Sequence, residues 1–350
     1  MNAVDTDRLQ WSKGDLERVQ ACPACGSHER LGGPLVCSDH VTYLPDEPWT
    51  VHRCACCQSV YLDPRPDSAS LPRAYETYYT HAADEGRAAT TGLGSVMWRA
   101  IHGYLNRRFG MARQPAVTWG YWLFVLLPPL RLKLDYYGRH LFADRYPARG
   151  RLLDVGCGNG DFLARAHDMG WRTVGIDPDP AAVAFCRSHG LDVVEGTLTQ
   201  SPCDWHSSFD IVTLRHCIEH VQQPDDYLRK AYDLLKPGGD IWVAWPNTRS
   251  LGFTFFREAW AEIHAPHHLC IPSPEQLEAM VKRSGFREVE FKRRGIHAKA
   301  SIRKSIENAK EIGKIDSKRI ILAYLVCIFI DIASTFFGKS GIEVVLTAKK

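Results

Sequence analysis

Residues Arg151 to Phe162, RLLDVGCGNGDF, carry the strongest local signal in the chain. Three apolar residues and an acid, over Leu152 to Val155, predict a short buried strand, which leads into a turn with glycine at 156, 158 and 160 and then into a helix. Only glycine permits so tight a turn and lets a ligand lie directly against the backbone. We therefore expect a ligand to bind where this strand ends.

Asp177 provides a second signal, twenty-one residues after Gly156 and at the end of a strand predicted over 173–176. An acidic side chain at this place accepts hydrogen bonds from the two hydroxyls of a ribose. The glycine spacing is GxGxG and not the GxGxxG that seats a pyrophosphate, so a dinucleotide is disfavoured. Asp154, just before the turn, suits a ligand with a cationic amino group.

The segment Leu153 to Gly160 resembles the first motif of the class I S-adenosylmethionine-dependent methyltransferases, and three later segments match the same family in order: GTL at 196–198, EH at 219–220, and LKPGG at 235–239. This resemblance implies an α/β fold with a Rossmann-like sheet of seven strands in the order 3-2-1-4-5-7-6. It also implies S-adenosylmethionine as the methyl donor. The residues expected to contact this cofactor are Asp154, Gly156, Cys157, Gly158, Gly160, Asp177, Thr197, Leu198 and Arg215.

Three histidines are candidates for the base that takes the proton of the methyl acceptor. His216 and His220 follow the fourth predicted strand, 209–214, and His268 lies in a PHHL segment that the family places next to the acceptor. A histidine near its normal pKa takes a proton at neutral pH. In the alternative interpretation, Glu219 and His220 only hold a loop and a helix together. Correct positioning of acceptor and methyl group also supplies much of the catalysis, so a base is not obligatory.

Two other groups of residues have a structural interpretation. His264, His267 and His268 lack a carboxylate or cysteine at metal-ligand spacing, so we expect no metal there. Tyr75, with Tyr78 and Tyr79, either lines the substrate entrance or packs the N-terminal region against the main domain.

The N-terminal cysteines predict a zinc site formed by Cys22, Cys25, Cys54 and Cys57, because each CxxC turn places two thiolates on one side of a tetrahedral ion. Reduced cysteines without metal are the alternative; a CxxC redox site is disfavoured because no βαβ pattern surrounds it. A zinc ribbon followed by a segment like 59–66 resembles a bacterial subgroup of methyltransferases, many of which act on sugars, polysaccharides or secondary metabolites. Gln58 stands where that subgroup usually has glycine.

The segment 320–337 is long and apolar enough to suggest a membrane span, with Asp331 as its one charge. However, the final strand, 341–348, must return between strands five and six of the sheet, and one crossing would leave it on the wrong side of the bilayer. The helix must therefore pack on the protein, dimerise or lie along a membrane surface. A second apolar segment, 117–134, contains only seven apolar residues in a row before Pro128.

Net charge is only +3, but two basic stretches stand out. Residues 99–151 contain ten Lys and Arg against two acids, and residues 282–319 contain thirteen against five. Each stretch adjoins one of the two apolar segments, a combination that an anionic bilayer attracts. We expect the two segments to form a cap over the acceptor site, which either rests on the inner membrane leaflet or is an ordinary soluble cap.

The predicted domains are a zinc ribbon at 1–66, a helical linker and cap at 67–149, a methyltransferase core at 150–294, a basic and apolar helical insertion at 295–340, and the last core strand at 341–350.

We expect a small-molecule or glycan acceptor, by resemblance a sugar or envelope polysaccharide precursor. The alternatives are a lipid or quinone acceptor at the membrane surface, and a non-catalytic ribbon adaptor that binds nucleic acid. The ribbon lacks interleaved aromatic and basic residues, so nucleic acid is not expected as a partner. The N-terminal residues do not form a secretory signal, which favours a cytoplasmic protein, peripheral on the inner membrane if the cap binds lipid. The sequence does not determine the oligomeric state.

Overall fold

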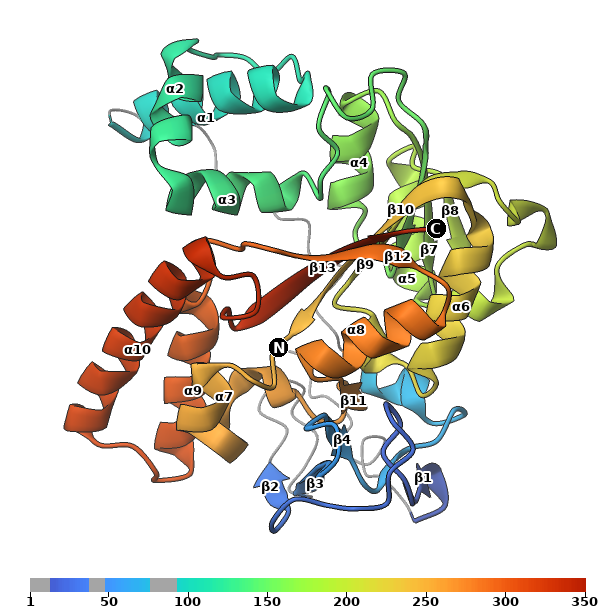
Figure 1. Cartoon of the computed structure of the whole chain (residues 1–350), viewed down its shortest axis with the longest axis vertical. Helices are drawn as coiled ribbons and strands as arrows, with labels where there is room; N and C mark the ends of the chain where they lie inside the picture. Colours follow the sequence, from blue (N-terminus) through green and yellow to red (C-terminus); the bar gives the residue numbers. More distant parts are fainter. Residues whose placement is uncertain (1–12, 38–47, 76–92) are drawn as a thin grey trace.

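The structure, a computed structural model, describes residues 13–37, 48–75 and 93–350, so Tyr78 and Tyr79 lie outside the described residues. Its centre is a sheet of seven strands in the order β12-β13-β10-β9-β6-β7-β8 (Figure 1). In chain order the strands are β6 (Arg151–Val155), β7 (Arg172–Asp177), β8 (Val193–Glu195), β9 (Phe209–Arg215), β10 (Leu235–Pro246), β12 (Arg287–Lys292) and β13 (Glu343–Lys349). Counted along the chain, this order is 3-2-1-4-5-7-6, as predicted. β13 runs antiparallel to β10 on one side and to β12 on the other, so the last strand does return between strands five and six.

Helices cover both faces of this sheet because successive side chains of each strand point to opposite faces. Leu152 belongs to the core formed with α4 (Asp161–Asp168) and α5 (Pro180–Ser188), whereas Leu153 belongs to the core formed with α6 (Pro224–Leu234) and α8 (Pro274–Arg283). The carboxyl ends of β6, β7 and β9 lie side by side because these strands run parallel. Open α/β sheets bind their ligands at that edge.

The N-terminal region is joined to the core by a shared sheet. Its strands β2 (Leu35–Cys37), β3 (Trp49–Arg53) and β4 (Val60–Leu62) continue into β11 (Cys270–Ile271), which belongs to the second half of the chain. A separate pair is formed by β1 (Leu16–Glu17) and β5 (Arg65–Pro66). The Ser273 hydroxyl also donates to the carbonyl of Cys57 at 2.6 Å, so the ribbon is fixed directly on the core.

The remaining helices lie along one side of the sheet (Figure 1). They are α1 (Leu93–Phe109), α2 (Trp119–Leu126), α3 (Pro128–Tyr137), α7 (Leu251–Phe256), α9 (Lys299–Glu311) and α10 (Ser317–Phe336). α10 contacts α3, α7 and α9, so the two apolar segments of the sequence meet in space.

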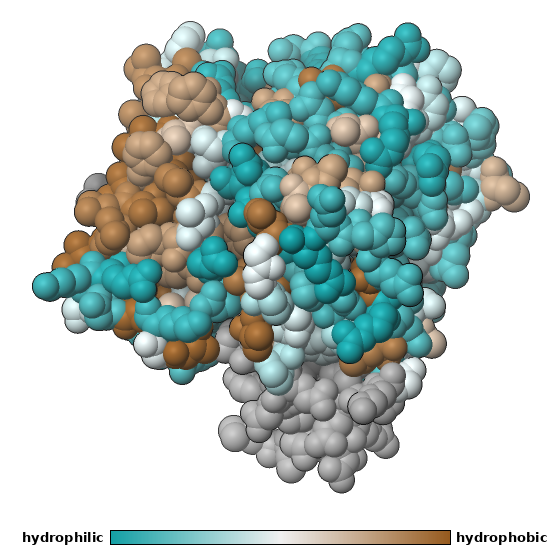
Figure 2. Space-filling view, turned by 60° about the horizontal axis from the view of Figure 1, so that its bottom comes forward, coloured by the Kyte–Doolittle hydropathy of each residue, from teal (hydrophilic) through white to brown (hydrophobic). Residues whose placement is uncertain are grey.

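α10 is the one helix of the described ranges that is long and apolar enough to cross a membrane, yet both of its ends connect to elements of the same body. It buries one narrow stripe that includes Ala323, Cys327, Ile330 and Ser334. Only 28% of its apolar window is buried, and the rest of its surface is exposed and apolar. Figure 2 shows apolar residues gathered on one side of the molecule.

Candidate active site and metal centre

The predicted cofactor loop follows β6 and contains three glycines in the left-handed backbone region. The φ angles of Gly156, Gly158 and Gly160 are 67°, 55° and 77°. A Cβ on Gly160 would lie 2.4 Å from Cδ1 of Leu191 and 2.9 Å from Sγ of Cys186, so any larger residue would force these side chains to move. The loop therefore has the shape that the sequence pattern predicts.

Asp177 ends β7 beside this loop, and its carboxylate is held by two backbone amides. Oδ2 accepts from the Gly158 amide at 2.8 Å, and Oδ1 accepts from the Asp179 amide at 3.0 Å. Burial raises the pKa of Asp177, an effect that these two hydrogen bonds oppose. A ribose placed over the glycine loop would thus meet an oriented acidic side chain, which fits S-adenosylmethionine.

Asp154 is placed differently from the expectation that it faces a cationic ligand. Its side chain is 2% exposed, forms an ion pair with Arg139 and accepts a hydrogen bond from the hydroxyl of Thr213. The guanidinium of Arg139 stacks on the ring of Phe162 at 3.7 Å. The charge of Asp154 is therefore already balanced by the chain, and contact between Asp154 and the cofactor stays a prediction.

The other cofactor candidates offer mainly backbone groups to a ligand. Cys157 and Leu198 point into the core, and a Cβ on Gly175 would lie 2.7 Å from the Cys157 sulfur. The Thr197 hydroxyl donates to Oε1 of Gln200 at 2.9 Å and caps a short helix. Burial in the core is enough to explain why residues 157 and 198 are apolar, without a contact to a ligand.

Arg215 ends β9 and His216 follows it, in a partly buried network of charges. His216 Nδ1 lies 3.0 Å from Glu219 Oε1, and His216 Nε2 lies 2.6 Å from Glu343 Oε2. Burial alone would lower the pKa of His216, but the two carboxylates outweigh burial and raise this pKa to about 10. His216 is therefore protonated at neutral pH, and both of its nitrogens are engaged. This geometry argues against His216 as the base.

The sequence did not indicate the partners that complete this network. Glu343 starts β13 and also accepts from Nε of Arg294 at 2.7 Å and from the hydroxyl of Tyr136 at 2.9 Å. Arg215 Nε in turn donates to the oxygen of Tyr136 at 2.9 Å. Burial by itself would raise the pKa of Glu343, but the charges of Arg294 and His216 hold it well below its usual value. These residues come from four separate parts of the chain, and no local spacing links them.

His220 and His268 lie together on the other side of Glu219, with ring centroids 4.6 Å apart. Burial and neighbouring histidines keep both pKa values well below 6.5, so both rings are neutral at neutral pH. His220 Nδ1 lies 2.8 Å from the hydroxyl of Tyr75, so this tyrosine connects the N-terminal region to the site. His268 Nδ1 lies 2.7 Å from the carbonyl of Glu262. A carbonyl only accepts, so Nδ1 of His268 carries the proton and its Nε2 has a free lone pair.

The histidine cluster was expected to lack a carboxylate, but the fold supplies one from another segment. Ligand atoms of Glu219, His220 and His268 lie within 4.8 Å of one another, and Nε2 of His268 is 4.0 Å from Oε1 of Glu219. These three groups could hold a metal ion. By contrast, Nε2 of His267 lies 2.7 Å from the carbonyl of Ala74, which gives this histidine a structural role.

The four predicted zinc ligands meet at the junction of ribbon and core. The sulfurs of Cys22 and Cys57 are 3.7 Å apart, and those of Cys25 and Cys54 are 3.6 Å apart. Tetrahedral coordination with Zn–S bonds of about 2.3 Å requires sulfurs about 3.8 Å apart. All four sulfurs lie within 4.8 Å of one another, so the cluster fits a zinc ion.

Other cysteines near this cluster do not belong to it. Cys56 is exposed, and Cys37 is buried in β2. Gln58 has a φ of 64°, the left-handed region that favours the glycine usual at this position. The departure at Gln58 therefore leaves the geometry of the turn intact.

Comparison with known proteins agrees with this geometry. Residues 134–290 match a family model described as a methyltransferase domain. The chain is 32% identical over 128 residues to the ubiquinone biosynthesis O-methyltransferase of Xanthomonas axonopodis pv. citri, which is 35% of this chain and 52% of that protein. It is 35% identical over 127 residues to the enzyme of the same name from Ruegeria pomeroyi, which is 33% of this chain and 50% of that protein. The chain thus spans about half the length of the curated relatives that it matches.

Solved structures with a related fold include a methyltransferase from Archaeoglobus fulgidus, with a TM-score of 0.42 and 21% identity over 62% of this chain and 94% of that one. Phosphoethanolamine N-methyltransferase 2 of Haemonchus contortus has a TM-score of 0.44 and 19% identity over 83% of this chain and 62% of that one.

The strand order, the glycine loop and the matched family together define the class. Residues 134–290 match a methyltransferase domain, and the sheet has the seven-strand order typical of the methyltransferase Rossmann fold. The ribbon and the helices α9 and α10 are additions outside the matched residues.

Proposed function

We propose that the whole protein is a methyltransferase that transfers the methyl group of S-adenosylmethionine to an oxygen of an acceptor anchored in a membrane by a lipid tail. The observation that carries this proposal is the exposed apolar face of α10. The names of the curated relatives support an oxygen as the methylated atom and a quinone-like lipid as the acceptor class. The sugar or polysaccharide acceptor implied by resemblance stays a prediction, because no contact among the described residues supports it.

The apolar face consists of exposed residues of α10 and of the α2–α3 corner, which are Trp119, Trp122, Leu126, Leu127, Ile321, Leu322, Tyr324, Leu325, Ile328, Phe329, Ile332, Phe336 and Phe337 (Figure 2). No charged side chain interrupts the outer surface of α10 between Arg319 and Lys339, since Asp331 is turned inward and accepts from the amides of His297 and Ala298. A monomer rarely exposes so large an apolar patch to water. Lys and Arg at its borders suit an anionic leaflet, on which the helix would lie in the plane of the surface.

The proposed base is His268, whose Nε2 has a free lone pair at the carboxyl end of the sheet. S-Adenosylmethionine, when bound over the glycine loop and Asp177, supplies an electrophilic methyl group. Nε2 of His268 would accept the hydroxyl proton of the acceptor as the acceptor oxygen bonds to the methyl carbon, while the carbon–sulfur bond breaks and its electron pair stays on the sulfur of the leaving thioether. The carboxylate of Glu219, 4.0 Å from this nitrogen, then stabilises the resulting imidazolium.

We also propose that Cys22, Cys25, Cys54 and Cys57 bind a structural zinc ion. Four thiolates leave no open position for a substrate. The role of the ion would be to fix the ribbon, and with it Tyr75, against the histidine cluster. The alternative of a non-catalytic adaptor would need a degraded cofactor site, whereas the glycine loop and Asp177 have intact geometry.

Calorimetry with S-adenosylmethionine tests the activity class. Asp177→Ala should weaken binding by on the order of 100-fold, because charge-assisted hydrogen bonds contribute about 1.5–3 kcal/mol. Asp168→Ala, an exposed acid at the end of α4, is the matched control and should bind like the wild type. No binding by the wild type would reject a working methyltransferase, and unchanged binding by Asp177→Ala would reject its role at the ribose.

Flotation with phosphatidylglycerol–phosphatidylcholine vesicles at about 0.15 M salt tests the membrane part. The double variant Ile328→Ser and Phe329→Ser removes two side chains that are 57% and 60% exposed, which should weaken vesicle binding by on the order of 100-fold. Leu31→Ser with Val36→Ser makes the same kind of change on the ribbon and should float normally. Wild-type protein that stays at the bottom of the gradient would reject membrane binding but not methyl transfer.

A further inference from the structure

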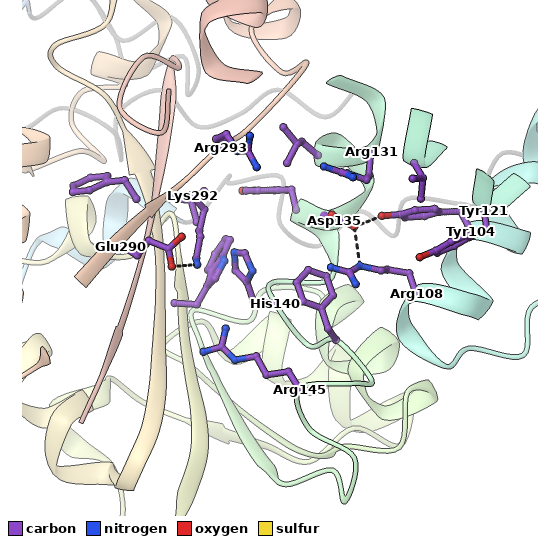
Figure 3. A pocket seen from close by; sticks show the side chains of 17 residues that line it. Tyr104, Arg108, Tyr121, Arg131, Asp135, His140, Arg145, Glu290, Lys292 and Arg293 are labelled. Atoms are coloured by element: carbon purple, nitrogen blue, oxygen red, sulfur yellow. Dashed lines mark hydrogen bonds and ion pairs between the residues drawn. The ribbon is translucent and has the colours of Figure 1, made fainter. Parts of the chain in front are cut away.

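A cavity of about 460 Å³ lies between the helices α1, α2 and α3 and the edge of the sheet formed by β10, β13 and β12 (Figure 3). No residue of the glycine loop lines it, and neither does Asp177. It is therefore separate from the expected cofactor position. One wall, Tyr136, is shared with the network around Glu343, so the cavity borders the active site.

The lining of this cavity is strongly basic. Its five cations are Arg108, Arg131, Arg145, Lys292 and Arg293, against two acids, Asp135 and Glu290. The pKa of His140, which also lines the cavity, is lowered to about 3. Burial is the main cause, and the charges of Lys292, Arg145 and Arg108 add to it. An uncompensated positive charge in a partly enclosed space attracts anions.

Two of these cations have free donors. Arg145 pairs with Asp240 at 2.8 Å, Lys292 pairs with Glu290, and Arg108 lies 3.8 Å from Asp135. The guanidinium groups of Arg131 and Arg293 form no hydrogen bond or ion pair within the described residues, although the charge of Arg131 acts on Asp135. Figure 3 shows both side chains at the cavity, Arg131 from α3 and Arg293 from the residue that follows β12. A guanidinium group offers several donors that match the oxygens of a phosphate group.

The cavity also lies directly behind the apolar face. Tyr121 and Val125 of α2 line the cavity, whereas their neighbours Trp122 and Leu126 are exposed on the apolar face. A molecule with its lipid tail against α2 and α10 could therefore reach the cavity with a polar group. This placement relates the cavity to the proposed membrane surface.

We propose that this cavity binds the phosphate group of an anionic phosphate ester, held between Arg131 and Arg293. The lipid source of this phosphate rests on the proposed function, whereas recognition of phosphate itself does not. The same chemistry is offered by a phospholipid headgroup and by free phosphate. Binding of either is independent of S-adenosylmethionine.

The test is calorimetry on the full chain loaded with zinc, without S-adenosylmethionine. The two probes are inorganic phosphate and dihexanoylphosphatidic acid below its micelle concentration. Arg131→Gln and Arg293→Gln should each weaken binding about ten-fold, and the double variant about 100-fold, since each removes a charge-assisted contact. Arg303→Gln removes an exposed cation of α9 outside the cavity and should bind like the wild type.

Tighter binding of phosphatidic acid than of phosphate would support a lipid headgroup as the source, and equal affinities would support recognition of phosphate alone. The proposal would be overturned if the wild type bound neither probe, if the double variant bound normally, or if Arg303→Gln lost as much affinity. Binding of S-adenosylmethionine by the double variant separates the two proposals. A variant that loses phosphate but keeps the cofactor shows that the cavity acts independently of the methyl-donor site.

Discussion

Replacement of Arg139 by methionine should destabilise the protein through the charge that it leaves behind. Asp154 is 2% exposed, and its partners are the guanidinium of Arg139 and the hydroxyl of Thr213. In Arg139→Met only the hydroxyl remains, and an uncompensated buried charge costs about 3–5 kcal/mol. A domain of this kind is stable by about 5–15 kcal/mol, so the loss is a large fraction of the total.

The effect can be measured by urea denaturation followed by tryptophan fluorescence, as a double-mutant cycle. Asp154→Asn should cost a similar amount because it leaves Arg139 unpaired. The double variant should cost less than the sum of the single variants by about 3 kcal/mol or more, because neither charge then remains buried alone. Arg229→Met, in an exposed pair with Asp226, is the control and should cost at most about 1 kcal/mol.

The pH dependence provides a second readout for the same variant. Burial already raises the pKa of Asp154 despite Arg139, and loss of Arg139 raises this pKa further. The free energy of unfolding that Arg139→Met loses relative to the wild type should therefore be largest near pH 8. This loss should shrink as the pH falls and Asp154 takes up a proton. Additive single variants, or a deficit that grows on acidification, would refute the interpretation of Asp154 and Arg139 as a coupled buried pair.

Four other outcomes are expected. Gly160→Ala should destabilise the protein by about 2 kcal/mol or more, because Gly160 has a φ of 77° and a Cβ there would lie 2.4 Å from Leu191. The same variant should lose cofactor binding. Urea denaturation measures the stability, and calorimetry measures the binding. Cys25→Ser should retain less than one zinc per chain by atomic absorption and unfold at a lower temperature, whereas Cys56→Ser should match the wild type. Gln58→Gly should change stability by no more than about 1 kcal/mol, since relief of a left-handed backbone is offset by loss of its hydrogen bond to Ala55 and by the flexibility of glycine. The free energy of unfolding of the wild type should fall between pH 6.5 and 10, because a histidine whose pKa is raised to about 10 stabilises fully below about pH 6.5 and less as the pH rises through 10. His216→Gln should show a flatter pH dependence of this free energy. Equal slopes in both proteins would contradict this.

The amino-acid sequence by itself determined where the central strands and the cofactor loop lie, because apolar runs predict buried strands and a tight left-handed turn requires glycine at 156, 158 and 160. The order of the strands in the sheet came from the resemblance to the methyltransferase family. The grouping of Cys22, Cys25, Cys54 and Cys57 was also predictable, because CxxC spacing alone places two thiolates on one side of an ion. The return of β13 between β10 and β12 followed from the fold that these motifs imply.

Only the tertiary structure decided which charges meet. Glu343 lies 127 positions from His216, and its contact with that histidine helps to raise the pKa of the ring to about 10. The carboxylate of Glu219 reaches His268 in the same way, although no spacing in the histidine segment predicts it. A pattern in the sequence reports the needs of the local backbone, whereas a pKa depends on burial and on charges brought together from distant segments. For the same reason the pairing of Arg139 with Asp154 and the cavity with Arg131 and Arg293 became visible only once α3 had packed against the sheet.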